Sequence, residues 1–171
     1  MWYAVWVKTG QEEKILQLCN ELIRMNQTEA FEECFLPRYE KYRKRNGKTE
    51  LLKELLFPGY LFFISEYPEE LEKLLKKIPG FAQLLGDDDG PIPLYPQEEE
   101  FLRKYTNADK VVEMSYGYIL GERIIVTDGP MKDYQGKIVH IDRHKRKAVL
   151  EVEFFGRRTE VTMGLETVKK G

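Results

Sequence analysis

The chain has 171 residues, of which 42% are apolar and 33% are charged. That composition can bury a core, so it excludes disorder over the whole length. The 27 Lys and Arg residues nearly balance the 29 Asp and Glu residues, and the formal net charge of −2 excludes a protein that coats nucleic acid with its whole surface.

The first part of the chain predicts an alternation of strands and helices. Aromatic and branched residues at 2–7 indicate a strand. Apolar residues spaced by three and four after Gly10 indicate an amphipathic helix, and five consecutive apolar residues at 60–64 are typical of a central, buried strand. The expected elements are, in chain order, strand 2–7, helix 11–26, strand 33–42, a basic hairpin that turns at Gly47, strand 60–64, a helix that begins at Pro68, strand 81–85 and a helix from Pro96 to near Tyr105.

This order is the split βαβ pattern of ferredoxin-like folds, in which two helices cover one face of a sheet. The segment that follows has no clean period and is interpreted as a linker, with a short strand as the alternative. Beyond it, short strands separated by glycines predict a small SH3-like β-barrel, at 122–127, 137–142, 148–154 and 159–162. The predicted fold class is α+β, with a first domain at 1–106, a linker at 107–118 and a second domain at 119–171.

Several segments together resemble the NusG family of transcription elongation factors. The N-terminal half is similar to the NusG N-terminal (NGN) domain, and the C-terminal half is similar to a KOW domain, in the order that the family has. The resemblance therefore covers essentially the whole chain. The matching segments are Trp2-Tyr3, Phe35-Leu36-Pro37, Phe57-Pro58-Gly59-Tyr60-Leu61-Phe62, Ile78 to Phe81, Pro91 to Leu94, Gly121 to Pro130, Gly136 to Val139 and Phe155 to Thr159.

Within the family, the trimmed chain is most similar to the specialised antitermination factors of the LoaP and RfaH group. RfaH carries a polar patch at the start of the second helix. The nearest residues here are 71–74, Leu-Glu-Lys-Leu, so that contact is not carried over. RfaH also stores its C-terminal domain as a helical hairpin. Here the strong β preference of 124–126 and 149–152 predicts a β domain throughout.

The resemblance implies a transcription elongation factor that promotes processive antitermination. Its N-terminal domain would bind the clamp helices of the largest subunit of bacterial RNA polymerase, and an RNA hairpin in the nascent leader would recruit it. Two alternatives stay open: a housekeeping NusG-type elongation factor, and a ribosome-associated RNA-binding KOW protein that does not act on polymerase. Because the sequence has no phosphate-binding loop and no nucleophile motif, an enzyme is the least expected class.

Aromatic residues near the first strand are the first candidate site. Strand alternation puts Trp2 and Trp6 on one face and Tyr3 on the other, so one face presents a large ring outward. Such rings mark protein contacts, with core packing as the alternative for each of them. The candidate polymerase-binding residues are Trp2, Trp6, Phe57, Pro58, Tyr60 and Phe81.

Two basic clusters are candidate RNA- or DNA-binding sites. Residues 36–48 hold six basic residues and one acid, interleaved with Tyr39 and Tyr42, which suits phosphate contact and base stacking. The turn at 143–147 suits the phosphates of an RNA hairpin. A solvated, charged surface is the alternative for both clusters. The candidates are Arg38, Lys41, Arg43, Lys44, Arg45, Lys48, Lys137, His140, Arg143, His144, Lys145, Arg146, Lys147, Arg157 and Arg158.

A third candidate site is the loop with Met131 and Tyr134. The resemblance implies contact there with a small-subunit ribosomal protein or the Rho factor, and a Tyr134 side chain packed on the barrel is the alternative. The acidic clusters at 87–89 and 98–100 have local explanations, because the first lies in a turn and the second at a helix start.

No metal or cofactor is expected. Cys19 and Cys34 lack the spacing of metal ligands, and His140 and His144, four residues apart, lie across a strand end. The apolar start at 2–7 is too short for a signal peptide or a membrane span. We expect a cytoplasmic monomer with reduced thiols and no contact with a membrane.

Overall fold

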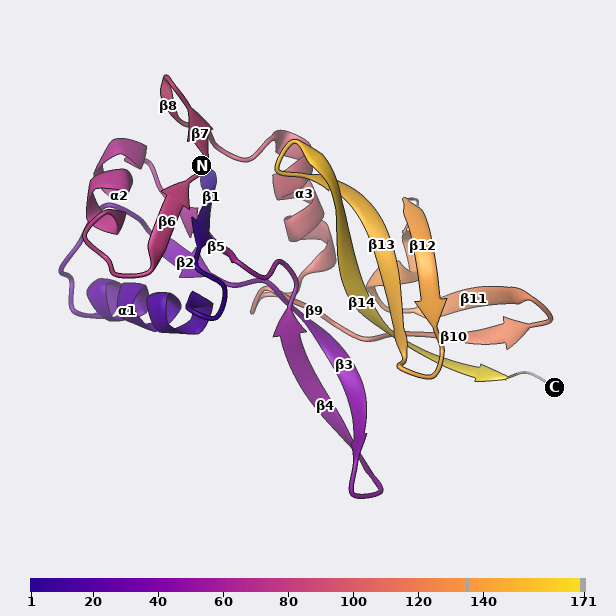
Figure 1. Cartoon of the computed structure of the whole chain (residues 1–171). Coiled ribbons are helices and arrows are strands. Elements are labelled where there is room, and N and C mark those ends of the chain that lie inside the picture. The colour runs from indigo at the N-terminus through magenta and orange to yellow at the C-terminus, as the bar shows by residue number, and fades with distance from the viewer. Residues whose placement is uncertain (135, 170–171) are drawn as a thin grey trace. The chain divides into compact units, whose positions relative to one another are not determined.

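The computed structural model, drawn in Figure 1, describes residues 1–134 and 136–169, with the side chains of residues 81–84 excepted. The chain divides into two compact units. Unit 1 comprises Met1–Leu36 and Phe57–Glu99, and unit 2 comprises Pro37–Leu56 and Glu100–Gly171. Each unit is thus built from two separate stretches of the chain.

Unit 1 contains a four-stranded sheet in the order β2-β5-β1-β6. The central strand β1 pairs antiparallel with both of its neighbours. The helices α1 and α2 lie beside this sheet in Figure 1. The bounds are β1 Trp2–Val7, α1 Glu12–Arg24, β2 Glu33–Phe35, β5 Tyr60–Ile64, α2 Pro68–Leu75, β6 Phe81–Leu84, β7 Gly86–Asp87 and β8 Gly90–Pro91, with β7 and β8 paired in a small hairpin.

The two faces of this sheet pack against different groups. One face meets α1, because Cys34 of β2 is hydrogen-bonded to the buried Cys19 of α1. The register pairs Cys34 with Phe63, so both side chains point to this helix-covered face. The opposite face carries a cluster of rings, in which Phe35 lies 5.2 Å from Trp2 and 5.6 Å from Phe62 between centroids. Of the apolar residues spaced along α1, Ile15 is buried, whereas Leu18 and Met25 are 43% and 54% exposed, so the apolar period predicts this helix but only part of its buried face.

Unit 2 contains a five-stranded sheet in the order β11-β10-β14-β13-β12 and a three-stranded sheet in the order β4-β3-β9. Figure 1 shows β3 and β4 as a long hairpin. The buried core of the larger sheet includes Phe154, Leu150 and Met163. The bounds are β3 Arg38–Arg45, β4 Lys48–Leu55, α3 Pro96–Tyr105, β9 Val111–Val112, β10 Ser115–Leu120, β11 Arg123–Asp128, a 3-10 turn Pro130–Asp133, β12 Lys137–Asp142, β13 Lys147–Phe154 and β14 Arg157–Lys169. The division between the units falls within α3, after Glu99.

Several sequence predictions agree with these bounds, and others differ. The helix predicted from Pro96 to Tyr105 and the strand at 137–142 are confirmed, and so is the hairpin turn, where Asn46 and Gly47 both have positive φ. The strand expected at 33–42 is interrupted at 36–37, because Pro37 has no N–H to donate to a strand ladder. The strand expected at 159–162 is the middle of the much longer β14.

The segment 107–118, interpreted above as a linker, contains β9 and most of β10. Val111 and Val112 are buried and pair in parallel with the start of β3. A two-residue strand has no period of its own, so it leaves no pattern in the sequence. The division at 1–106 and 119–171 stays a prediction. Among the described residues, no helix is long and apolar enough to cross a membrane.

Candidate functional site

Trp6 is the exception in an otherwise buried strand. Its side chain is 50% exposed, whereas Trp2 on the same face is 5% exposed. In the β1–β5 register Trp6 stands opposite the half-buried Tyr60, and a Cβ added to Gly59 would lie 3.9 Å from the indole ring. The exposed Pro58 precedes Gly59 in the chain. We call Trp6, Pro58 and Tyr60 the Trp6 surface.

A buried carboxylate holds the turn beneath this surface. Glu12, at the first position of α1, is 4% exposed and accepts hydrogen bonds from the backbone N–H groups of Gly10 and Gly59. Gly59 is itself buried and has a φ of +89°, a conformation that favours glycine. A buried carboxylate is costly unless it is hydrogen-bonded, so these two donors explain why Glu12 is tolerated. Sequence reasoning missed Glu12, because an acid in the first turn of a helix is ordinarily explained by the helix dipole alone.

The other aromatic candidates lie elsewhere. Trp2 and Phe57 are buried in the ring cluster, where Phe57 lies 5.8 Å from Phe62, so neither presents an exposed ring. This corrects the expectation that Trp2 and Phe57 belong to an outward-facing surface: the face opposite the helices packs its own rings along most of its length. Phe81 begins β6, and its side chain lies outside the described residues.

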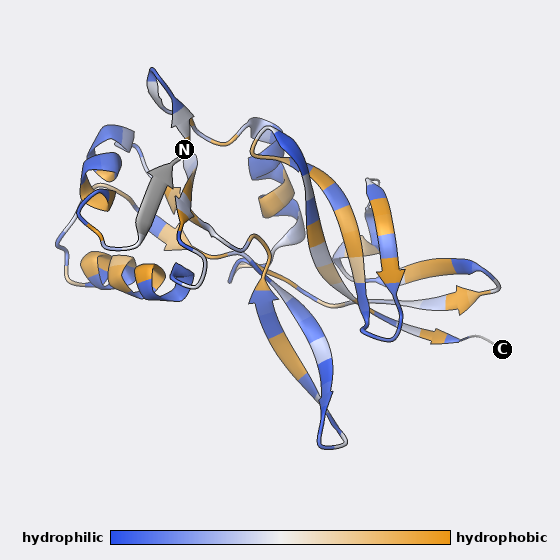
Figure 2. Ribbon diagram, in the orientation of Figure 1, coloured by the Kyte–Doolittle hydropathy of each residue, from blue (hydrophilic) through white to orange (hydrophobic). Residues whose placement is uncertain are grey.

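The basic hairpin is exposed toward its tip. Arg43, Lys44, Arg45 and Lys48 are exposed, and Figure 2 colours most of β3 and the tip as hydrophilic. The Arg43 guanidinium lies 3.6 Å from a carboxylate oxygen of Glu50 on β4. Closer to the base of the hairpin, Arg38 and Lys41 are half-buried. Cations are thus concentrated at the distal end of the hairpin.

The two hairpin tyrosines pack within unit 2 and do not point freely into solvent. The Tyr42 hydroxyl lies 2.8 Å from that of Tyr116 on β10, and the Arg146 guanidinium lies 6.0 Å from the centre of the Tyr42 ring. Tyr39 is hydrogen-bonded to Thr162, and burial raises its pKa. The hydroxyls of both tyrosines thus have protein partners, which favours a structural role for these rings over the predicted stacking on bases.

The hydrogen bond between Tyr42 and Tyr116, together with burial and nearby negative charge, raises the pKa of Tyr116 from 10.0 to about 12. Because the folded pKa is above the unfolded one, the stabilisation is present below pH 10 and is lost as the pH rises toward 12. We expect Tyr42→Phe to return the pKa of Tyr116 toward 10.0 in an NMR titration of ring-labelled tyrosine. Tyr95→Phe, at an exposed tyrosine of unit 1, is the control, and an unchanged Tyr116 pKa in Tyr42→Phe would contradict the contact.

The second basic cluster is the turn between β12 and β13. Arg143, His144 and Lys145 are exposed. The Asp142 carboxylate accepts the backbone N–H of Lys145 at 2.9 Å and closes the turn. That hydrogen bond, followed by the charges of Lys145, His140 and Lys147, lowers the pKa of Asp142. Arg146 has a φ of +55°, and its Nε lies 3.2 Å from a Glu166 carboxylate oxygen, so this cation holds the turn on β14.

The remaining basic candidates are separated from this turn. Arg157 and Arg158 pair with Phe154 and Glu153 at the end of β13 opposite the turn, which is about 20 Å away along the strand. Lys137 pairs with Glu151 in the same half of the sheet, and its amine lies 3.6 Å from that carboxylate. His140 is exposed on β12. The structure thus brings together the turn residues but not the whole predicted set.

In the loop that holds Met131 and Tyr134, these two side chains pack against the protein, whereas Lys132 and Asp133 between them are exposed. Met131 is 3% exposed. The Tyr134 ring packs edge-on against Tyr105 at 5.7 Å, and its hydroxyl donates to the backbone carbonyl of Glu151 at 3.3 Å. This arrangement is the alternative given above, in which the Tyr134 side chain packs on its own domain. These two side chains therefore offer little surface to a ribosomal protein or to Rho.

The acidic clusters have local roles, as expected from the sequence. The Asp87 carboxylate accepts the backbone N–H of Asp89 at 2.8 Å within the β7–β8 turn. The Glu98 carboxylate accepts the N–H of Tyr95 at 2.7 Å at the start of α3. In the part of the chain that the structure describes, no three His, Cys, Asp or Glu side chains are grouped to hold a metal ion.

A four-stranded split βαβ sheet followed by a sheet of short strands is the architecture expected of a two-domain transcription elongation factor. The family model described as "Transcription termination factor nusG" matches residues 1–103, and the KOW motif matches residues 120–153. The chain belongs to the NusG family. It is a NusG-type transcription termination/antitermination factor, and the predicted combination of NGN and KOW domains is confirmed.

The sequences of curated relatives match almost the whole chain. Proteins named "Transcription termination/antitermination protein NusG" from Rickettsia felis and Staphylococcus carnosus are each 28% identical to it. Both matches cover 99% of this chain, and they cover 89% and 94% of the relatives. The solved structure "Domain interaction in Thermotoga maritima NusG" has the same fold, with a TM-score of 0.56, 22% identity and coverage of 95% of this chain and 92% of that one. These relatives fit the housekeeping and the antiterminator branches of the family equally.

Proposed function

We propose that this factor binds RNA polymerase through the Trp6 surface, on the clamp helices of the largest subunit. The half-exposed indole of Trp6, in a strand that is otherwise buried, is the single observation that carries the proposal. A large exposed aromatic beside a proline and a tyrosine is the composition of a protein-binding hot spot. The buried Glu12 supports the proposal, since it fixes the turn on which these side chains stand.

The proposed mechanism needs no chemical step. A polymerase clamp that opens during pausing and termination is a two-state element, and a protein that binds the closed state more tightly shifts the equilibrium toward it. The shift is limited by the difference in affinity for the two states. The factor would thereby keep the polymerase processive and promote antitermination.

Recruitment to particular transcripts is proposed to depend on the basic segments of unit 2. Exposed cations on the hairpin and on the 143–147 turn suit the phosphates of an RNA hairpin in the nascent leader. This step separates the antiterminator branch from the housekeeping branch, which would act on any transcript.

The first test is co-elution of the full chain with bacterial core RNA polymerase. We expect Trp6→Ala/Tyr60→Ala to weaken binding about 30-fold or more, the factor that corresponds to a hot spot of about 2 kcal/mol. Tyr67→Ala/Tyr95→Ala is the matched control, because it removes two exposed rings of unit 1 outside the Trp6 surface. Equal binding by the two double variants would reject the Trp6 surface. An absence of wild-type binding would favour the RNA-binding KOW protein.

The second test is readthrough of a terminator on templates with and without a leader that encodes an RNA hairpin. We expect readthrough with wild type on the leader template alone, and its loss in Arg143→Glu/Lys145→Glu without loss of polymerase binding. Arg123→Glu/Lys132→Glu, which reverses two other exposed cations of unit 2, is the control. Equal readthrough on both templates would support the housekeeping alternative instead.

A further inference from the structure

The basic hairpin is fastened to the five-stranded sheet at its middle. Glu40 accepts the backbone N–H of Met114 at 2.9 Å through its carboxylate, and the Tyr42 hydroxyl bonds that of Tyr116. Gly164 of β14 lies directly against the Glu40 carbonyl and the Met114 sulfur. We call Glu40, Tyr42, Met114, Tyr116 and Gly164 the clasp. All five belong to unit 2.

The basic turn meets the hairpin at the same place. The Arg146 guanidinium lies over the ring of Tyr42 and pairs with Glu166 of β14. The Arg146 carbonyl accepts the backbone N–H of Leu165, the residue after Gly164, at 2.9 Å. The Arg146 side chain therefore contacts both the hairpin and β14. Arg146 belongs to the same turn as the exposed cations Arg143 and Lys145.

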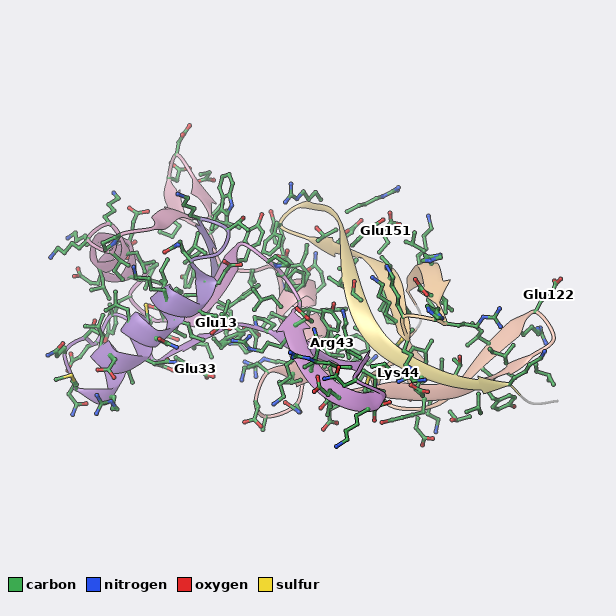
Figure 3. The ribbon with its side chains drawn as sticks, turned by 60° about the horizontal axis from the view of Figure 1, so that its bottom comes forward. Glu13, Glu33, Arg43, Lys44, Glu122 and Glu151 are labelled. Atoms are coloured by element: carbon green, nitrogen blue, oxygen red, sulfur yellow. The ribbon has the colours of Figure 1, made fainter. Side chains whose placement is uncertain are left out.

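This contact brings two clusters that are far apart in sequence into one neighbourhood. Lys44 and Arg45 follow Tyr42 by two and three residues, which is about 7–10 Å along a strand. Arg143 and Lys145 lie within three residues of Arg146. Each group of cations therefore lies within about one Debye length, about 10 Å at 0.1 M salt, of the contact between Tyr42 and Arg146. Figure 3 labels Arg43 and Lys44 on the hairpin.

We propose that the distal hairpin and the 143–147 turn form one composite surface that binds the phosphate backbone of a double-helical RNA stem, with the clasp as its positioning element. The inference rests on the proposed function and deepens it, because it names how the RNA is held. The exposed cations of the surface are Lys44, Arg45, Lys48, Arg143 and Lys145, and the exposed His144 lies among them.

The contacts of the two hairpin tyrosines favour an RNA stem over a single-stranded RNA as the ligand. Proteins that bind single strands stack bases on exposed aromatic rings. Here the Tyr42 ring contacts the Arg146 guanidinium, and its hydroxyl is hydrogen-bonded to that of Tyr116. Tyr39 is hydrogen-bonded to Thr162. Both hairpin tyrosines thus have protein partners, while the cations beside them are exposed, which favours recognition of a duplex by its shape and phosphates.

Gly164 provides a test that changes no charge. A Cβ at this position would collide with the Glu40 carbonyl, which is backbone, so Gly164→Ala forces the hairpin away from β14. Tyr116→Phe is a milder second variant, because it removes only the hydroxyl that bonds Tyr42. Circular dichroism on each full-length variant verifies that the β structure is retained.

The experiment measures the binding of a fluorescent RNA hairpin, with a stem of about 16 base pairs, across 50–200 mM salt by anisotropy. We expect Lys44→Glu/Arg45→Glu to weaken wild-type binding about tenfold at the lowest salt and to reduce the salt slope by about 2. In the Gly164→Ala background the same reversal should change affinity less than about twofold, because the hairpin no longer reaches the RNA. Tyr116→Phe should shift binding in the same direction as Gly164→Ala, by less.

Each outcome decides a different point. If wild type does not bind the RNA hairpin, the RNA part of the proposed function fails, and the composite surface fails with it. If wild type binds but the hairpin reversal costs the same in both backgrounds, only the composite surface is overturned. Equal affinity for a DNA duplex of the same sequence would overturn the assignment of RNA as the ligand.

Discussion

Phe62→Ala is expected to lower the free energy of unfolding of unit 1 by about 3–5 kcal/mol. Phe62 is fully buried at the centre of the ring cluster and packs against both Phe35 and Phe57. Removing its ring leaves a cavity that the rigid strands around it cannot fill. The loss should lower the melting temperature by roughly 10 °C, given about 2–4 °C per kcal/mol for a chain of this size.

Tryptophan fluorescence in urea is the measurement, because both tryptophans of the chain, Trp2 and Trp6, lie in unit 1. Tyr67→Ala is the control: its ring is 58% exposed, so its effect should stay within about 0.5 kcal/mol. A Phe62→Ala midpoint equal to that of the control would mean that the ring cluster is not the core of this unit.

The second large effect is expected at Glu12. Glu12→Ala leaves the buried N–H of Gly59 without its acceptor, which should cost about 1–3 kcal/mol of stability. The same change releases the turn that carries Pro58 and Tyr60. Polymerase binding should therefore weaken by more than the loss of stability explains, even under conditions where the variant is fully folded.

Two variants separate these effects at Glu12. Glu12→Gln keeps a carbonyl oxygen for one of the two N–H groups and should retain part of the stability and of the binding. Glu13→Ala, at the exposed neighbouring acid, should change neither by much. Full polymerase binding by folded Glu12→Ala would show that the turn does not position the Trp6 surface.

The elements with strong local signals were predictable from the sequence. Proline and three acids mark the start of α3, and the helix runs from Pro96 to Tyr105 as expected. Asn46 and Gly47 both adopt positive φ at the hairpin turn, which a Gly after Asn favours. In such cases the backbone preference of a few adjacent residues is enough to specify the conformation.

The site was predictable in part. Strand alternation correctly indicated that β1 presents an aromatic outward, but it did not distinguish Trp6 from Trp2. The difference arises from Phe35, which covers Trp2 from a strand that is distant in sequence. Glu12 escaped prediction for a similar reason, since its second donor, Gly59, is 47 residues away.

The sequence by itself determined the family, the order of helices and strands, and the two concentrations of positive charge, because each depends on residues close together in the chain. The tertiary structure alone decided which aromatic rings are exposed and which tyrosines contact other protein groups. It also decided that the hairpin and the 143–147 turn meet at Tyr42 and Arg146. These features depend on contacts between residues far apart in sequence. Burial and pairing there follow from how strands pack against one another, and no local pattern encodes them.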